Sequence, residues 1–134
     1  MSESYEHRQL VEKSARWVIE NLLDGESVYL TIDLDRSLNH DRLDPVLDNF
    51  RPDLYAYVPK SELLIIGESK TTDDIDREHS IQQYKSYYAT CSLNRGDSFI
   101  VFSIPFSTKP RLKNVLRNAN ILSSEKIRIQ ILEF

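Results

Sequence analysis

The amino-acid sequence predicts an α/β protein in which helices flank a mixed β-sheet, with the element order α-β-β-β-α-β-α-β. Three observations support this fold class. Apolar residues near the start recur at helical spacing, and five later runs are rich in β-branched and aromatic residues. Segments with helix-start signals separate the later runs. The length of 134 residues, with 40% hydrophobic and 28% charged residues, suits one globular domain over residues 1–134.

The first half of the chain predicts a helix over about residues 6–23, which Asp24-Gly25 ends. A strand is expected over Val28–Ile32, where β-branched and aromatic residues gather. Residues 33–51 are polar and read as a long loop with room for one short helix, and such a loop could contact a substrate.

After this loop, the sequence predicts strands at residues 54–58 and 63–66, joined by a turn at 59–62. The continuous apolar run at 63–66 is typical of a central strand buried on both faces. The remaining elements are a helix from Thr72, Asp73 or Asp74 to about Thr90, a strand at Ser98–Ile104, a helix from Pro110 to about Asn118, and a half-exposed edge strand at Lys126–Leu132. The acids Asp73, Asp74, Asp76 and Glu78 are expected at the positive end of the first of these helices.

Composition and charge exclude several function classes. No apolar run is long enough to span a membrane, and the polar first residues resemble neither a signal nor a transit peptide. Cys91 is the single cysteine, so we expect a reducing, cytoplasmic location and a buried role for its side chain. The net charge of −4 argues against strong non-specific nucleic-acid binding, although residues 109–117 carry four bases and no acid. The three histidines have no metal-ligand spacing and are expected at the surface: His7, His40 and His79.

Three residues near the turn at 59–62 suggest a chemical site: Asp53, Glu68 and Lys70. If Val58 pairs with Leu63 across the turn, counting outward places Asp53 directly opposite Glu68, at roughly 4.5–5.5 Å between Cα atoms. Lys70 shares their face if the strand continues to it. Two adjacent carboxylates favour a divalent cation, and a neighbouring lysine can stabilise an anion or orient water. These are the components of metal-assisted phosphodiester hydrolysis.

Arg51-Pro52-Asp53 and Gly67-Glu68-Ser69-Lys70, with the element order, resemble the PD-(D/E)xK nuclease superfamily, whose core is α-β-β-β-α-β. The resemblance covers about residues 6–105 and implies a restriction-endonuclease-like fold. It implies that Asp53 and Glu68 bind Mg²⁺ or Mn²⁺ and that Lys70 acts on water. It also implies a metal-binding acid on the first helix, for which Glu12 matches best and Glu6 and Glu20 compete.

Gln83-Tyr84-Lys85-Ser86-Tyr87 is similar to the Gln-x-x-x-Tyr motif of RecB-type and type I restriction nucleases. The spacing stacks Gln83 and Tyr87 on one helix face, where they could reach substrate phosphate or the lysine. Ile81, Tyr84 and Tyr88 are expected to form the core face of that helix. The later bases are either phosphate contacts or a solvated helix face: Lys109, Arg111, Lys113 and Arg117.

The sequence therefore predicts a metal-dependent nuclease acting on nucleic acid, with DNA favoured. Its expected catalytic residues are Asp53, Glu68, Lys70 and Gln83. The expected metal ligands are Glu12, Asp53 and Glu68. The expected substrate contacts are Gln83, Tyr87, Lys109, Arg111 and Lys113. One alternative is a catalytically inactive module of the same fold that binds nucleic acid or a protein. Another is a small scaffold with accidental motifs, in which Asp53 and Glu68 would lie apart or face solvent. Small size also suggests a homodimer that addresses two strands.

Overall fold

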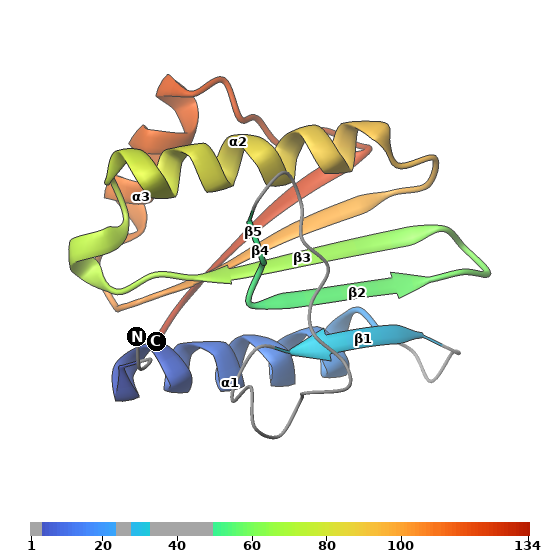
Figure 1. Cartoon of the computed structure of the whole chain (residues 1–134), viewed down its shortest axis with the longest axis horizontal. Helices are drawn as coiled ribbons and strands as arrows, with labels where there is room; N and C mark the ends of the chain where they lie inside the picture. Colours follow the sequence, from blue (N-terminus) through green and yellow to red (C-terminus); the bar gives the residue numbers. More distant parts are fainter. Residues whose placement is uncertain (1–3, 24–27, 33–49) are drawn as a thin grey trace.

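The computed structural model describes residues 4–23, 28–32 and 50–134, and within them the expected element order is confirmed (Figure 1). Three of the sequence-based expectations lie outside the described residues: the helix stop at Asp24-Gly25, the position of His40, and residues 33–49 of the expected loop. The helices are α1 (Tyr5–Asn21), α2 (Glu78–Leu93) and α3 (Lys109–Asn118), with a 3₁₀ turn η1 (Thr72–Asp74). The strands are β1 (Tyr29–Ile32), β2 (Leu54–Val58), β3 (Leu63–Ser69), β4 (Ser98–Ile104) and β5 (Ile127–Glu133).

The five strands form one mixed sheet in the order β1-β2-β3-β4-β5. β1, β2 and β3 pair antiparallel, whereas β3, β4 and β5 pair parallel. β3 is thus the central strand, and its residues from Leu64 onward are buried, as the apolar run predicts. The carboxyl ends of β3, β4 and β5 meet at one edge of the sheet, since Ser69, Ser103 and Leu132 are neighbours in the parallel register.

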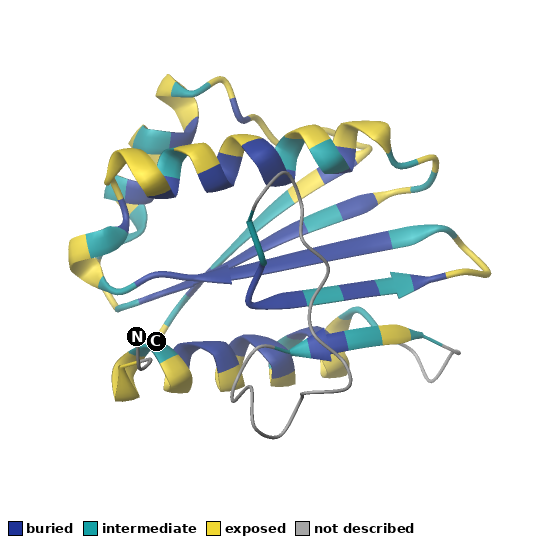
Figure 2. Ribbon diagram, in the orientation of Figure 1, coloured by how far each residue is buried: buried dark blue, intermediate teal, exposed yellow. Residues whose placement is uncertain are grey.

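Helices cover both faces of the sheet (Figure 1), with α1 on one face and α2 and α3 on the other. Each face has its own apolar cluster. The α1 cluster joins Ala15 and Val18 to Leu54, Ile65 and others, while the larger opposite cluster joins helices α2 and α3 to alternate residues of the strands. Figure 2 shows the buried residues concentrated in the central strands and on the inward sides of the helices. Within the described residues, no helix has the length and apolar character needed to cross a membrane.

Gly67 on β3 lies close to β2 and in ordinary contact with α1. A Cβ at this position would lie 2.9 Å from the Cβ of Leu54 and 3.6 Å from the Oγ of Ser14 on α1. The hydroxyl of Ser103 on β4 donates to the carbonyl of Leu10 at 2.8 Å, which ties the same helix to the next strand. The two contacts fix the amino-terminal half of α1 across the strands that carry the expected site.

The start and the buried face of the helix at 78–93 differ from expectation. Thr72–Asp74 form the separate turn η1, and α2 begins only at Glu78. Between η1 and α2 the Ser80 hydroxyl donates to the carbonyl of Asp74, and the Asp76 side chain pairs with Arg111 on α3. Of the four acids expected in the first turn of this helix, Glu78 alone lies there.

The face of α2 that packs on the sheet carries Ser80, Gln83, Tyr84, Tyr87 and Cys91. Tyr84 is fully buried as expected, but Ile81 and Tyr88 are half-buried, so the expected core face was displaced by part of a turn. Cys91 is buried as predicted, and burial raises the pKa of its thiol to about 12.

Candidate active site

The hairpin of β2 and β3 brings the expected acids together. The predicted register is confirmed, with Val58 opposite Leu63 and Leu54 opposite Gly67. Asp53 immediately precedes β2 and Glu68 lies near the end of β3, so the same register sets the two residues against each other. The backbone N–H of Ser69 donates to Oδ2 of Asp53 at 2.8 Å, which holds this carboxylate against the end of β3.

Glu68 is a buried carboxyl group, with 4% of its surface exposed. The Tyr87 hydroxyl donates to Oε1 at 2.8 Å, and the Lys70 ammonium lies 3.4 Å from Oε2. Burial, and secondly the charge of Asp53, raise the pKa of Glu68 to about 8, although Lys70, Tyr87 and His7 act in the opposite direction. A cation bound here would favour the ionised form of Glu68 and offset its repulsion with Asp53.

Lys70 is held by contacts on both sides. Its backbone N–H donates to the carbonyl of Ser103 at 3.1 Å, and its ammonium donates to Oε1 of Gln83. Lys70 and Gln83 are each 9% exposed. Gln83 and Tyr87, one turn apart on α2, thus reach the lysine and the acid respectively, and the expected convergence of this helical pair on the hairpin is found.

His7 on α1 is a site residue that the sequence analysis missed. Its Nε2 lies 3.2 Å from Oδ2 of Asp53, and the side chain is 22% exposed rather than on the open surface. The available signal was helical period, because His7 is one turn before Val11 and shares the buried stripe with Ser14 and Val18. The expectation that His7 is a surface residue was wrong, whereas His79 is exposed as predicted.

The three acids considered on the first helix lie on its exposed side. Glu12 and Glu20 line a surface hollow with Ala15, Arg16 and Ile19, and Glu6 is also exposed. The helical period rotates these positions away from the stripe that faces the sheet. Glu12, the expected first-helix metal ligand, is thus exposed, and the residue of α1 that contacts Asp53 is His7.

The basic residues of α3 are divided between two sides. Arg111, expected as a substrate contact, forms a two-bond ion pair with Asp76 at 2.9 and 3.1 Å. This hydrogen bonding lowers the pKa of Asp76. Asp74 lies 3.3 Å from Arg77, so two of the acids after Lys70 have arginine partners. Lys109 and Lys113 lie on another side of α3, with Arg117.

Comparisons with protein-family models, curated proteins and solved structures gave no match. What the site can do therefore follows from its own side chains.

The donor set suits a hard divalent cation. Asp53 and Glu68 supply carboxylate oxygens, which Mg²⁺ and Mn²⁺ prefer. Among residues 4–23, 28–32 and 50–134, no three His, Cys, Asp or Glu side chains form a ready-made metal cluster. A cation held here would complete its coordination with water or substrate oxygens, as Mg²⁺ commonly does.

Proposed function

We propose that the chain is a metal-dependent nuclease of the PD-(D/E)xK type that hydrolyses phosphodiester bonds, with DNA as the favoured substrate. The carrying observation is that Asp53, Glu68 and Lys70 meet on a buried hairpin while Gln83 and Tyr87 bond to the lysine and the acid. The proposal includes the restriction-endonuclease-like arrangement of the fold, a cytoplasmic location and a homodimer. Measuring the mass of the protein in solution tests whether it forms a dimer.

The two acids are the residues that would hold Mg²⁺ or Mn²⁺. When bound, such a cation neutralises charge on the phosphate and lowers the pKa of water. Glu68 must lose its proton to serve as a ligand, and the hydroxyl of Tyr87 and the ammonium of Lys70 favour the ionised form. His7 and the N–H of Ser69 orient the Asp53 carboxylate through Oδ2.

Lys70 is the residue that positions the attacking water and faces the developing negative charge. Its ammonium has three N–H donors, of which Gln83 accepts one and Glu68 lies near another. The remaining donor capacity is available to a water or a phosphate oxygen. Gln83 therefore acts on the reaction by fixing the direction of the Lys70 side chain. The compact ammonium charge of Lys70 suits contact with a water or a phosphate oxygen.

The scaffold interpretation expects Asp53 and Glu68 to lie apart or to face solvent. Both residues are buried, at 8% and 4% exposure, and the charge of Asp53 acts on Glu68. Burying two neighbouring carboxyl groups costs folding free energy. This cost supports a functional role for the pair.

Cleavage of a nucleic-acid panel tests the proposal. Wild type, Glu68→Gln and Lys70→Ala are incubated with single-stranded and duplex DNA and with RNA, in Mg²⁺, Mn²⁺ or EDTA. We expect metal-dependent cutting that both variants lose by at least about a hundredfold. Glu125→Gln and Lys60→Ala are matched controls, because both side chains are exposed and outside the site. Cutting that survives in both site variants contradicts the proposal.

A second comparison tests the assignment of the first-helix residue. We expect His7→Ala to weaken cutting, because Asp53 loses a partner at 3.2 Å, whereas Glu12→Gln leaves it unchanged. The reverse pattern would restore Glu12 as the metal ligand. Calorimetry with Mn²⁺ decides the case in which nothing is cut. If wild type binds Mn²⁺ and Glu68→Gln does not, a substrate or partner is missing from the assay. If wild type neither binds Mn²⁺ nor cuts, the inactive binding module is favoured.

A further inference from the structure

A strained turn after β4 holds an aromatic ring in water. Phe106 is 76% exposed, and the next residue, Ser107, has a φ of 69°, in the left-handed region that non-glycine residues rarely adopt. The turn is nevertheless well tied, since the Thr108 hydroxyl donates to the carbonyl of Pro105 at 2.6 Å and the N–H of Phe106 donates to Phe134 at 2.9 Å. The Phe106 ring is therefore presented to solvent by a backbone that hydrogen bonds hold in place.

This turn lies at the edge of the sheet that carries the candidate active site. Lys70 donates through its backbone N–H to Ser103, and Phe106 is three residues further along the chain. Its Cα is therefore at most about 11 Å from that of Ser103. A nucleotide in contact with Phe106 is close enough to belong to the same bound strand as a phosphate at Lys70.

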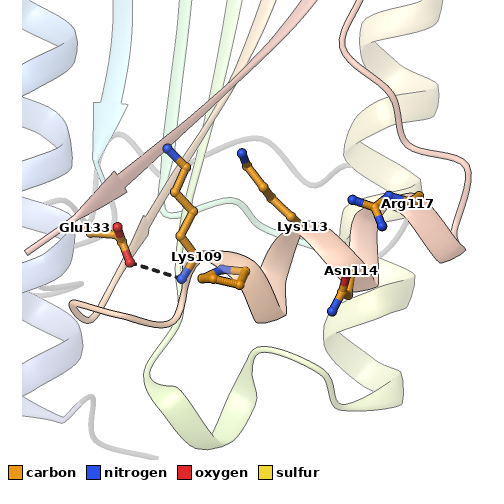
Figure 3. A pocket seen from close by; sticks show the side chains of 6 residues that line it. Lys109, Lys113, Asn114, Arg117 and Glu133 are labelled. Carbon is orange, nitrogen blue, oxygen red and sulfur yellow. Dashed lines mark hydrogen bonds between the residues drawn. The ribbon is translucent and has the colours of Figure 1, made fainter.

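Three cations follow the turn on one side of α3. Lys109, Lys113 and Arg117 are spaced by four residues and line a surface hollow of about 440 Å³ (Figure 3). The long side chains of Lys109 and Lys113 extend in the same direction in Figure 3. Four residues of helix rise by about 6 Å, so the three charges form a row along the surface.

These cations differ from Arg111 in their partners. Arg111 is paired with Asp76, but none of the three side chains in the row forms an ion pair with the part of the chain that the structure describes. The one acid in the hollow, Glu133, accepts a hydrogen bond from the backbone N–H of Lys109 at 3.1 Å. The row therefore presents positive charge on a protein whose net charge is −4.

We propose that this surface binds an unpaired nucleic-acid strand, with a base stacked on Phe106 and the phosphates along Lys109, Lys113 and Arg117. The inference rests on the proposed function for nucleic acid as the ligand and specifies the strand form. An aromatic ring beside a row of cations is the combination that single-strand binding uses. A base in an intact duplex is stacked and paired, so only an unpaired strand offers Phe106 a free face.

Fluorescence anisotropy in EDTA tests the stacking contact, because binding is measured there without cleavage. The probes are a labelled oligothymidylate and a duplex of the same length. We expect the single strand to bind more tightly, Phe106→Ala and Phe106→Leu to weaken it by about 5- to 100-fold, and Phe106→Tyr to retain it. Leu93→Ala is the control, since Leu93 is an 86% exposed apolar residue on α2.

Salt dependence tests the row of cations. Alanine at Lys109, Lys113 or Arg117 should each reduce the slope of log affinity against log salt by about 0.7, the single-strand value per phosphate contact. Lys60→Ala, in the turn between β2 and β3, should leave the slope unchanged. Slopes that do not move in the three variants overturn the assignment of the row.

The two proposals fail separately. Equal binding by wild type and all Phe106 variants, or tighter binding of the duplex, overturns the single-strand surface even when wild type cleaves DNA. Strand binding that depends on Phe106, in a protein that cleaves nothing with either metal and binds no Mn²⁺ through Glu68, supports this surface and removes the nuclease proposal.

Discussion

Replacing Glu68 by glutamine should change how stability depends on pH. The ordinary pKa of a glutamate, 4.5, is raised to about 8 in the folded protein by burial, with the charge of Asp53 as the second cause. Between these two values the folded chain keeps a proton that the unfolded chain has lost. The free energy of unfolding therefore falls as pH rises through this window, and the contribution is lost at about pH 8.

The slope from one such group is at most about 1.4 kcal/mol per pH unit. Over the interval from 4.5 to about 8 this amounts to the order of 4 kcal/mol. Glutamine keeps the shape of the side chain and an acceptor for Tyr87 but cannot ionise. We therefore expect the Glu68→Gln variant to match wild type near the acid end of the window and to exceed it in stability at the alkaline end.

Urea denaturation in EDTA, repeated from about pH 5 to about pH 9, measures both free energies. The quantity of interest is the difference between the two proteins, because groups common to both cancel. Glu125→Gln, at an exposed position, controls for loss of one acid. A difference that stays constant across the window would refute the reasoning that Glu68 is a buried acid with a raised pKa.

Three further predictions follow from the site and its packing. Mg²⁺ or Mn²⁺ should bind more tightly as pH rises toward about 8, because the ligand Glu68 must ionise. Binding should therefore release up to about one proton from the protein. Calorimetry in buffers of different ionisation enthalpy measures the number of protons released. Gln83→Ala should lower kcat by up to about a hundredfold with a smaller change in KM, because Lys70 loses the acceptor that directs its ammonium. Gln82→Ala changes the exposed neighbouring residue and should leave kcat unchanged. Steady-state kinetics on a cleaved oligonucleotide compares the two variants. Gly67→Ala should destabilise the fold by about 1–3 kcal/mol in urea, because the new Cβ meets a side chain of β2 at 2.9 Å; unchanged stability would mean that α1 and β2 yield easily.

Features set by short-range rules could be predicted from the sequence. The strands at 54–58 and 98–104 have the expected bounds, because runs of β-branched and aromatic residues end at turns or proline. The turn at 59–62 determines the hairpin register, and the register in turn brings Asp53 and Glu68 together. Helical period alone places Gln83 and Tyr87 on the same side of α2.

Features that depend on long-range packing could not be predicted in this way. Which residue of α1 reaches Asp53 depends on how the helix crosses the sheet, where Ser14 lies against Gly67 and the Leu10 carbonyl accepts from Ser103. Asp76, expected in the first turn of α2, instead pairs with Arg111, a residue 35 positions later. Sequence spacing carries no information on either contact, so the contact of His7 was missed and the helix start was misplaced.

The hairpin of β2 and β3 also has a consequence for the folding pathway. Its strands are neighbours in the sequence, so they pair at the cost of closing one short loop, whereas α1, α2 and β4 must arrive from greater distances along the chain. The two acids are therefore expected to meet early, before His7, Tyr87 and Gln83 reach them. A partly folded chain would hold a repelling pair of carboxylates without these partners. The late docking of the helices onto the hairpin would then complete the fold and the catalytic geometry in the same cooperative step.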